Sequence, residues 1–161
     1  MSEPYALAEL LTRHAQIGRV EWIGLRPARK APLETVDAAD IDESGLVGDR
    51  HTSPGKRAVT LIQAEHLPVI AALIGADAID PADLRRNIVV SGINLTALRK
   101  AELKVGGALV RVSGPCAPCS RMEKTLGFGG YNAMRGHGGW CAEVIAPGRV
   151  ALGDPVEPST D

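Results

Sequence analysis

The sequence is poor in aromatic residues, which make up 3% of its 161 positions. Proteins that bind single-stranded nucleic acid stack bases on aromatic side chains, so this scarcity argues against such a platform. The net charge of −1 gives no general attraction to nucleic acid or to an acidic membrane. No apolar run reaches the length of about 18 residues that a membrane-spanning helix needs. The N-terminal stretch MSEPYALAELL does not resemble a signal peptide. We therefore expect a cytoplasmic protein without nucleic-acid or membrane partners.

Cysteine is also scarce, and the chain has an odd number of cysteines, three. This composition fits a reducing compartment better than a disulfide framework. The chain is rich in turn-forming residues instead, with 18 glycines and 11 prolines. Its length and its apolar content of 45% favour a single domain, which we assign to residues 1–156, with a polar tail at 157–161.

Alternating apolar residues and frequent turns predict a strand-rich, mixed α/β fold, namely a β-barrel with two or three peripheral helices. An irregular acidic loop is expected from residue 37 to residue 51. Helices are predicted at 5–14, 63–75 and 118–126. The strands are predicted at 19–27, 33–36, 56–62, 88–90 and 106–114, with two more in 140–156 joined by a turn at Pro147 and Gly148.

Cys116 and Cys119 form a Cys-x-x-Cys motif in the stretch VSGPCAPCSRM. A thioredoxin-type redox pair needs a βαβ context that the flanking sequence lacks. A zinc site needs two further ligands, whereas the third cysteine and the four histidines are scattered. Buried cysteine often only fills a core, and this is our interpretation for Cys141. The remaining interpretation is a thiolate ligand to a transition metal that arrives in a cofactor with ligands of its own.

The stretch DLRRNIVVSG is suited to an anionic cofactor because it places Arg85, Arg86 and Asn87 ahead of a predicted strand. Arginine forks bind phosphate and planar heterocycles, and an asparagine amide both donates and accepts hydrogen bonds.

Two other stretches carry basic residues next to glycine. GDRHTSPGKRAV holds Lys56 and Arg57, and NAMRGHGGWC sets Arg135 beside Gly138 and Gly139, where the backbone can approach a ligand closely. Each of the three stretches taken alone is better explained by solvated surface charge or by a loop that only turns the chain. Their occurrence together with the cysteine motif favours a cofactor site.

The order of these motifs resembles the MOSC domain, a family named after the C-terminal domain of molybdenum cofactor sulfurases. The matching pieces run from about Gly18 to Val156, and APCSRM and GRVALGDPV are the most distinctive. The resemblance implies a barrel-like fold of the compact, stand-alone bacterial type that binds a molybdenum cofactor. It implies that Cys119, which follows Pro118, binds molybdenum or carries sulfur. The candidate cofactor contacts are Arg85, Asn87, Arg86, Arg135, Lys56, Arg57, Gly138 and Gly139.

We therefore expect a molybdenum-cofactor-dependent oxidoreductase that reduces a small N-hydroxylated substrate, with Cys119 as the catalytic residue and the molybdenum ligand. A separate electron-transfer or cofactor-delivery protein is expected as a partner. Two alternatives stay open. The domain is a carrier of sulfur or of the cofactor that uses a Cys119 persulfide, or it is a metal-free module in which Cys116 and Cys119 form a redox switch.

Overall fold

Seven strands close into a barrel in the computed structural model, which describes residues 5–160. The pairing of Gly18 with Val156 and of Arg19 with Pro155 closes the ring between the first and the last strand. The predicted strand-rich barrel is therefore confirmed. Around the ring the strands are β11 (Pro155–Pro158), β7 (Glu102–Val105), β8 (Ala108–Pro115), β9 (Trp140–Ala146), β5 (Val59–Gln63), β6 (Ile88–Ser91) and β1 (Gly18–Leu25).

Four further strands lie beside the barrel. β2 (Glu34–Val36) pairs with the end of β1, while β3 (Ala38–Asp42), β4 (Gly45–Leu46) and β10 (Gly148–Ala151) form a separate sheet in the order β10-β3-β4. The prediction of an irregular acidic loop at 37–51 is therefore wrong for β3 and β4. Acidic residues occupy the exposed positions of β3, whereas Ala39 and Ile41 alternate with them and are buried.

The barrel interior is filled by inward-facing aliphatic residues. In β8, Ala108, Val110 and Val112 are buried and alternate with more exposed positions, as expected for a strand with one face on the core. β5 is buried along its whole length. Val59 and Leu61 belong to the interior cluster, and Ile62 belongs to a second cluster outside the barrel.

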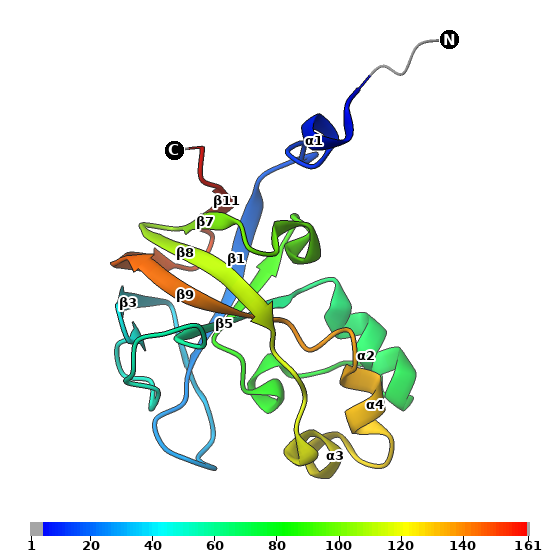
Figure 1. Cartoon of the computed structure of the whole chain (residues 1–161). Helices are drawn as coiled ribbons and strands as arrows, with labels where there is room; N and C mark the ends of the chain where they lie inside the picture. Colours follow the sequence, from blue (N-terminus) through cyan, green and yellow to red (C-terminus); the bar gives the residue numbers. More distant parts are fainter. Residues whose placement is uncertain (1–4, 161) are drawn as a thin grey trace.

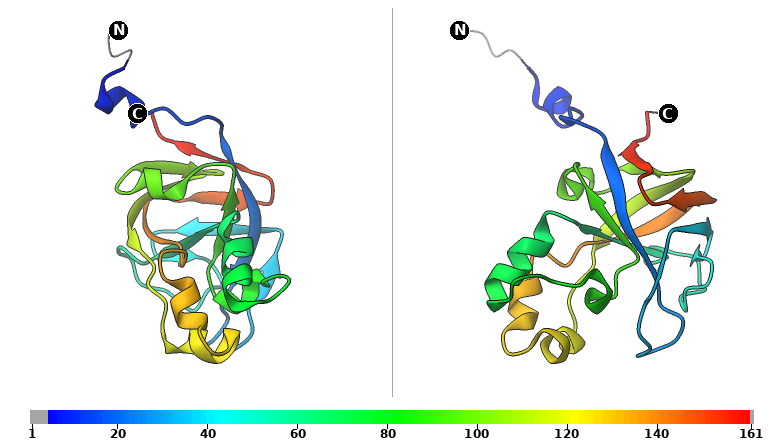
Figure 2. Two further views of the ribbon diagram at one scale, coloured as in Figure 1. Left: turned by 90° about the vertical axis from the view of Figure 1, so that its right-hand side faces the viewer. Right: turned by 180° about the vertical axis from the view of Figure 1, so that it is seen from behind.

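The α-helices that follow the N-terminal one gather at one end of the barrel, away from the N-terminal helix and from β11 (Figures 1 and 2). They pack on the outer face of β5 and β6 through the second cluster, which includes Ile62, Val89, Ile70, Met122 and Met134. The elements are α2 (His66–Ile74), α3 (Ser120–Leu126), α4 (Gly130–Met134) and the 3₁₀ turn η1 (Pro81–Leu84). A second 3₁₀ turn, η2 (Leu95–Leu98), instead buries Leu95 and Leu98 in the interior cluster. None of the helices in residues 5–160 has the length and apolarity to cross a membrane.

Two predicted segments near the chain ends differ from the structure. The helix expected at 5–14 is a single turn, α1 (Leu7–Leu10), and Leu7 and Leu11 are exposed, so no packed face supports a longer helix. At the other end, β11 continues to Pro158 and pairs with β7, two residues into the predicted polar tail.

Candidate functional site

Cys119 lies at the end of the barrel that carries the helices, in the loop between β8 and α3. Its side chain is exposed, and its backbone carbonyl accepts a hydrogen bond from the Met122 N–H (2.9 Å) as the first bond of α3. The loop is held at its start, where the Cys116 N–H donates to the Gly139 carbonyl (2.9 Å). The thiol of Cys119 is thus presented to solvent by a loop that is fixed at both sides.

Six arginines surround a cavity of about 420 Å³ at Cys119, which we call the arginine pocket. No acidic side chain is among the residues that line it. The arginines come from four separate parts of the chain, and the fold brings them to one thiol. The lining residues are Arg26, Arg29, Arg50, Arg85, Arg86, Cys119, Arg121 and Met122.

Arg26 is fixed by a buried carboxylate behind it. Its Nε and one terminal nitrogen donate to the two oxygens of Asp49 at 3.1 and 2.8 Å, and its backbone N–H donates to the same carboxylate at 2.7 Å. Burial acts to raise the pKa of Asp49, but these hydrogen bonds and the charge of Arg26 outweigh it and lower that pKa. Asp49 therefore stays ionised and orients Arg26 toward the pocket.

Asn87 contacts Asp49 of the Asp49–Arg26 pair from inside the barrel, and its side chain does not line the arginine pocket. It is fully buried, and its Oδ1 accepts from both the backbone N–H and the hydroxyl of Thr60. Its Nδ2 donates to the Gly24 carbonyl and to Asp49, each at 3.2 Å. The amide is saturated by protein partners. Asn87 therefore reaches a ligand only indirectly, through Asp49 and Arg26.

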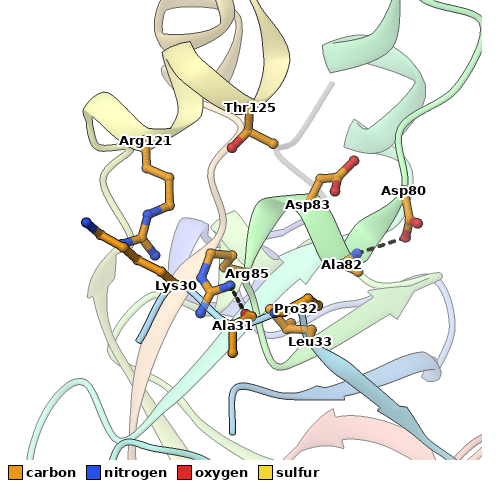
Figure 3. Close-up of a pocket in the computed structure, with 10 residues that line it drawn as sticks. All are labelled: Lys30, Ala31, Pro32, Leu33, Asp80, Ala82, Asp83, Arg85, Arg121 and Thr125. Atoms are coloured by element: carbon orange, nitrogen blue, oxygen red, sulfur yellow. Dashed lines mark hydrogen bonds between the residues drawn. The ribbon is translucent and has the colours of Figure 1, made fainter. Parts of the chain in front are cut away.

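Arg85 lies close to three other arginines of the pocket. One of its terminal nitrogens donates to the Ala31 carbonyl at 2.6 Å, which ties the loop after β1 to the end of η1 (Figure 3). Burial, followed by the charges of Arg121, Arg26 and Arg50, lowers the pKa of Arg85. Like charges held this close repel one another, so the cluster is suited to an anionic ligand.

Beyond Arg85 and Arg121 lies a further cavity of about 500 Å³, which we call the lateral pocket (Figure 3). It includes two carboxylates, Asp80 and Asp83, and it does not include Cys119. The Asp80 side chain caps η1 by accepting from the Ala82 N–H at 3.0 Å.

Arg86 connects the arginine pocket to the glycine-rich turn. Only 8% of its surface is exposed, and its guanidinium donates to the carbonyls of Gly138 (2.7 Å), Leu84 (3.0 Å) and Cys116 (3.3 Å). These bonds use most of the N–H donors of Arg86. Its main role is therefore to fix the walls of the site, and its positive charge remains at the edge of the arginine pocket.

Arg135, Gly138 and Gly139 line a different cavity, which we call the apolar pocket. It has a volume of about 450 Å³, and it contains Cys116 and Trp140 but not Cys119. The two glycines are needed for packing. A Cβ on Gly138 would lie 2.7 Å from the Cys116 carbonyl oxygen, and one on Gly139 would collide with the Leu61 carbonyl.

Cys116 differs chemically from a cysteine that only fills space. Its pKa is lowered to about 6, first by a hydrogen bond from the Cys141 thiol and then, against the effect of burial, by the charges of Arg86 and other arginines. The pKa of the buried Cys141 is raised by the same hydrogen bond and by burial. The partner of Cys116 is therefore Cys141, its diagonal neighbour across the β8–β9 pairing.

Lys56 and Arg57 are exposed and line neither the arginine pocket nor the apolar pocket. The charge of Arg57 contributes to the low pKa of Cys116. Within residues 5–160, no three or more His, Cys, Asp or Glu side chains are grouped so that they could hold a metal ion. A metal bound at Cys119 would therefore depend on ligands brought by a cofactor.

The order of motifs along this barrel also matches a family model. The model described as MOSC domain matches residues 47–157, more than half of the chain. The chain belongs to the MOSC domain family. No curated protein matches the sequence.

Solved structures share the MOSC fold at low sequence identity. The YuaD protein from Bacillus subtilis is 22% identical with a TM-score of 0.77, covering 88% of this chain and 94% of that one. YiiM from Escherichia coli is 24% identical with a TM-score of 0.70, covering 89% and 70%. YiiM from Geobacillus stearothermophilus is 17% identical with a TM-score of 0.71, covering 88% and 75%. These likenesses establish the fold.

The predicted cofactor contacts of this MOSC domain do not include four of the six pocket arginines, namely Arg26, Arg29, Arg50 and Arg121. Arg26 and Arg29 follow directly on β1 in the stretch LRPARK, and three cations within five residues at a strand end were the available signal. Arg121 is two residues from Cys119, inside the quoted cysteine motif. Arg50 lies in the basic stretch GDRHTSPGKRAV, of which only Lys56 and Arg57 are among the predicted cofactor contacts.

Proposed function

We propose that this MOSC protein binds a molybdenum cofactor in the arginine pocket, with the thiolate of Cys119 as the protein ligand to molybdenum, and that it is an oxidoreductase acting on N-hydroxylated compounds. The observation that carries the proposal is the exposed thiol of Cys119 in a cavity lined by six arginines and no acidic side chain. A phosphate-bearing, metal-dithiolene cofactor needs both kinds of partner.

The donor set fits such a cofactor. A cysteine thiolate is a soft ligand that suits a thiophilic metal, and arginine forks suit phosphate oxygens. Arg85, Arg26, Arg50 and Arg121 would contact the phosphate, while Arg86 would act chiefly by fixing the walls of the pocket. When bound, the cofactor supplies two-electron redox chemistry at molybdenum, and the protein contributes position and electrostatics.

The residues of the chain then have separate tasks. Cys119 presents its sulfur from a fixed loop, which limits the positions that a ligated metal can take. The Asp49 carboxylate holds Arg26 in place, so an anion meets a guanidinium that needs no reorientation. The crowding of Arg85 by Arg121 and Arg50 is relieved when an anion binds, and this relief favours the bound state.

Exposure of the Cys119 thiol also favours a second candidate function. A thiol that another protein can reach could hold a persulfide for transfer, as a carrier would require. The proposed oxidoreductase therefore includes a separate electron-transfer protein as its partner. The proposed carrier includes a separate acceptor protein.

The two functions separate in one experiment. The protein is purified from a host that makes the cofactor and is supplied with molybdate, and it is then assayed with an N-hydroxylated base and an artificial electron donor. Turnover that is lost in Cys119→Ser supports the oxidoreductase. A reducible sulfur adduct on Cys119 in the intact mass, without turnover, supports the carrier. Absence of both contradicts both proposals.

A further inference from the structure

Two basic cavities meet at Cys119. Besides the arginine pocket there is a second cavity of about 430 Å³, which we call the lysine pocket. Both contain Cys119, Arg29 and Arg121, and acidic side chains line neither of them. Each volume lies in the range of small-ligand sites. The lysine pocket is lined by Arg29, Lys30, Cys119, Ser120, Arg121 and Lys124.

The cations of the two cavities are held differently. In the arginine pocket, Arg26, Arg85 and Arg86 are fixed by protein acceptors before any ligand arrives. In the lysine pocket, Lys30 and Lys124 are exposed, and neither forms an ion pair with another described residue. A prebuilt cage suits a ligand that stays bound, whereas flexible lysines suit one that exchanges.

We propose that the lysine pocket binds the phosphate group of an exchangeable substrate whose reacting end reaches Cys119. This inference rests on the proposed function, because it leaves the arginine pocket to the cofactor. It narrows the substrate class to N-hydroxylated compounds that carry a phosphate monoester, such as a nucleotide. An uncharged N-hydroxylated base would lack the group that this pocket binds.

The other two cavities are less suited to this role. The lateral pocket does not contain Cys119, and the carboxylates of Asp80 and Asp83 oppose an anion there. The apolar pocket has no lining residue in common with the two cavities at Cys119. Apart from the arginine pocket, which is left to the cofactor, the lysine pocket is the described cavity at Cys119 whose charge favours a phosphate.

Binding to the cofactor-free protein tests the proposal without any requirement for activity. Cytidine 5′-monophosphate and cytidine are titrated separately while amide shifts are followed by NMR. We expect the monophosphate, and not cytidine, to shift the amides of residues 120–124. Lys124→Glu should weaken that response about tenfold. Arg50→Glu should leave it in place and instead weaken the response of residues 85–87.

Lys104→Glu, an exposed lysine of β7, is the matched control, because it changes the net charge equally and should leave both responses unchanged. Equal responses to the two ligands would overturn the proposal. The proposal would also be overturned if Lys124→Glu left the amide shifts of residues 120–124 with the monophosphate intact. It would likewise be overturned if Arg50→Glu alone removed those shifts.

A kinetic arm uses the cofactor-loaded protein, an N-hydroxylated cytidine and its 5′-monophosphate. Lys124→Glu should raise KM for the monophosphate about tenfold and leave KM for the nucleoside unchanged. If neither compound is reduced, the proposed oxidoreductase function fails, while the amide shifts still decide whether the lysine pocket binds phosphate. If both KM values change equally, the phosphate subsite is excluded and the proposed function stands.

Discussion

The Asn87 side chain donates a hydrogen bond to Asp49 at 3.2 Å, and Asp49 holds the Arg26 side chain through two further hydrogen bonds. A buried amide inside the barrel is thereby connected to a guanidinium in the pocket at Cys119. The chain of contacts explains why an asparagine ahead of β6 matters for the site although no ligand can touch it. It also makes the pocket dependent on the integrity of the barrel.

Asn87→Ala should destabilise the fold strongly. The substitution removes the hydrogen bonds that the Asn87 amide makes with Asp49, the Gly24 carbonyl and Thr60 inside the barrel, so we expect a loss of about 2–4 kcal/mol in the free energy of unfolding. Urea denaturation measures this. Asn94→Ala is the control, since Asn94 is exposed and only caps η2, and its cost should stay near 1 kcal/mol. Similar losses for the two variants would contradict the role given to Asn87.

Arg121→Gln should separate stability from ligand binding. Removing one of several like charges from the pocket should change the free energy of unfolding by less than about 0.5 kcal/mol, or raise it. The same variant should bind inorganic phosphate more weakly, and the difference should shrink with added salt because exposed charges are screened. A large loss of stability with unchanged phosphate binding would show that Arg121 is structural.

The ion pair of Asp49 predicts an acid-sensitive fold. The folded-state pKa of Asp49 lies below the ordinary value of 3.8, so its contribution to stability is complete above that value and is lost as the pH falls through the folded pKa. Unfolding followed between pH 6 and pH 2 should show a steeper loss in the parent than in Asp49→Asn, which has no proton to bind there. Parallel pH profiles would contradict the assignment.

Cys116 should react as a thiolate at mild pH. With a pKa of about 6, its alkylation rate should rise with pH and reach half of its maximum near that value. Cys141→Ala removes the donating thiol and should shift this midpoint upward. Peptide mapping of iodoacetamide adducts measures the rate for each cysteine separately. An unchanged midpoint in Cys141→Ala would show that the two thiols do not interact.

The pattern of apolar residues predicts where most strands lie, but it does not predict which strands pair with each other. The alternation in residues 106–114 and 140–156 locates β8, β9 and β10. The second stretch also holds the start of β11, a third strand, and β10 pairs with β3 and not with β9. A local pattern records which face of a strand is buried and does not record which strand covers it. The acidic stretch at 37–51 was misread for a related reason, because its exposed acidic residues hide a short buried alternation.

The sequence predicts those site residues that belong to a recognisable motif. It does not predict residues that reach the site only because the fold brings distant segments together. Cys119, Arg85 and Arg86 come together as the motifs suggested. Arg26 and Arg50 reach the same pocket only because the ends of β1 and of the β4 loop are brought beside η1, and the sequence does not show this.

The central claim is that the Cys119 sulfur holds molybdenum, and metal analysis of matched cysteine variants tests it most directly. Parent, Cys119→Ser and Cys116→Ser proteins are purified from the same molybdate-fed host, checked for equal melting temperature, and measured for molybdenum and pterin per chain. We predict that Cys119→Ser loses molybdenum while Cys116→Ser, whose thiol faces another pocket, retains it. Equal molybdenum content in the parent and Cys119→Ser would contradict the account.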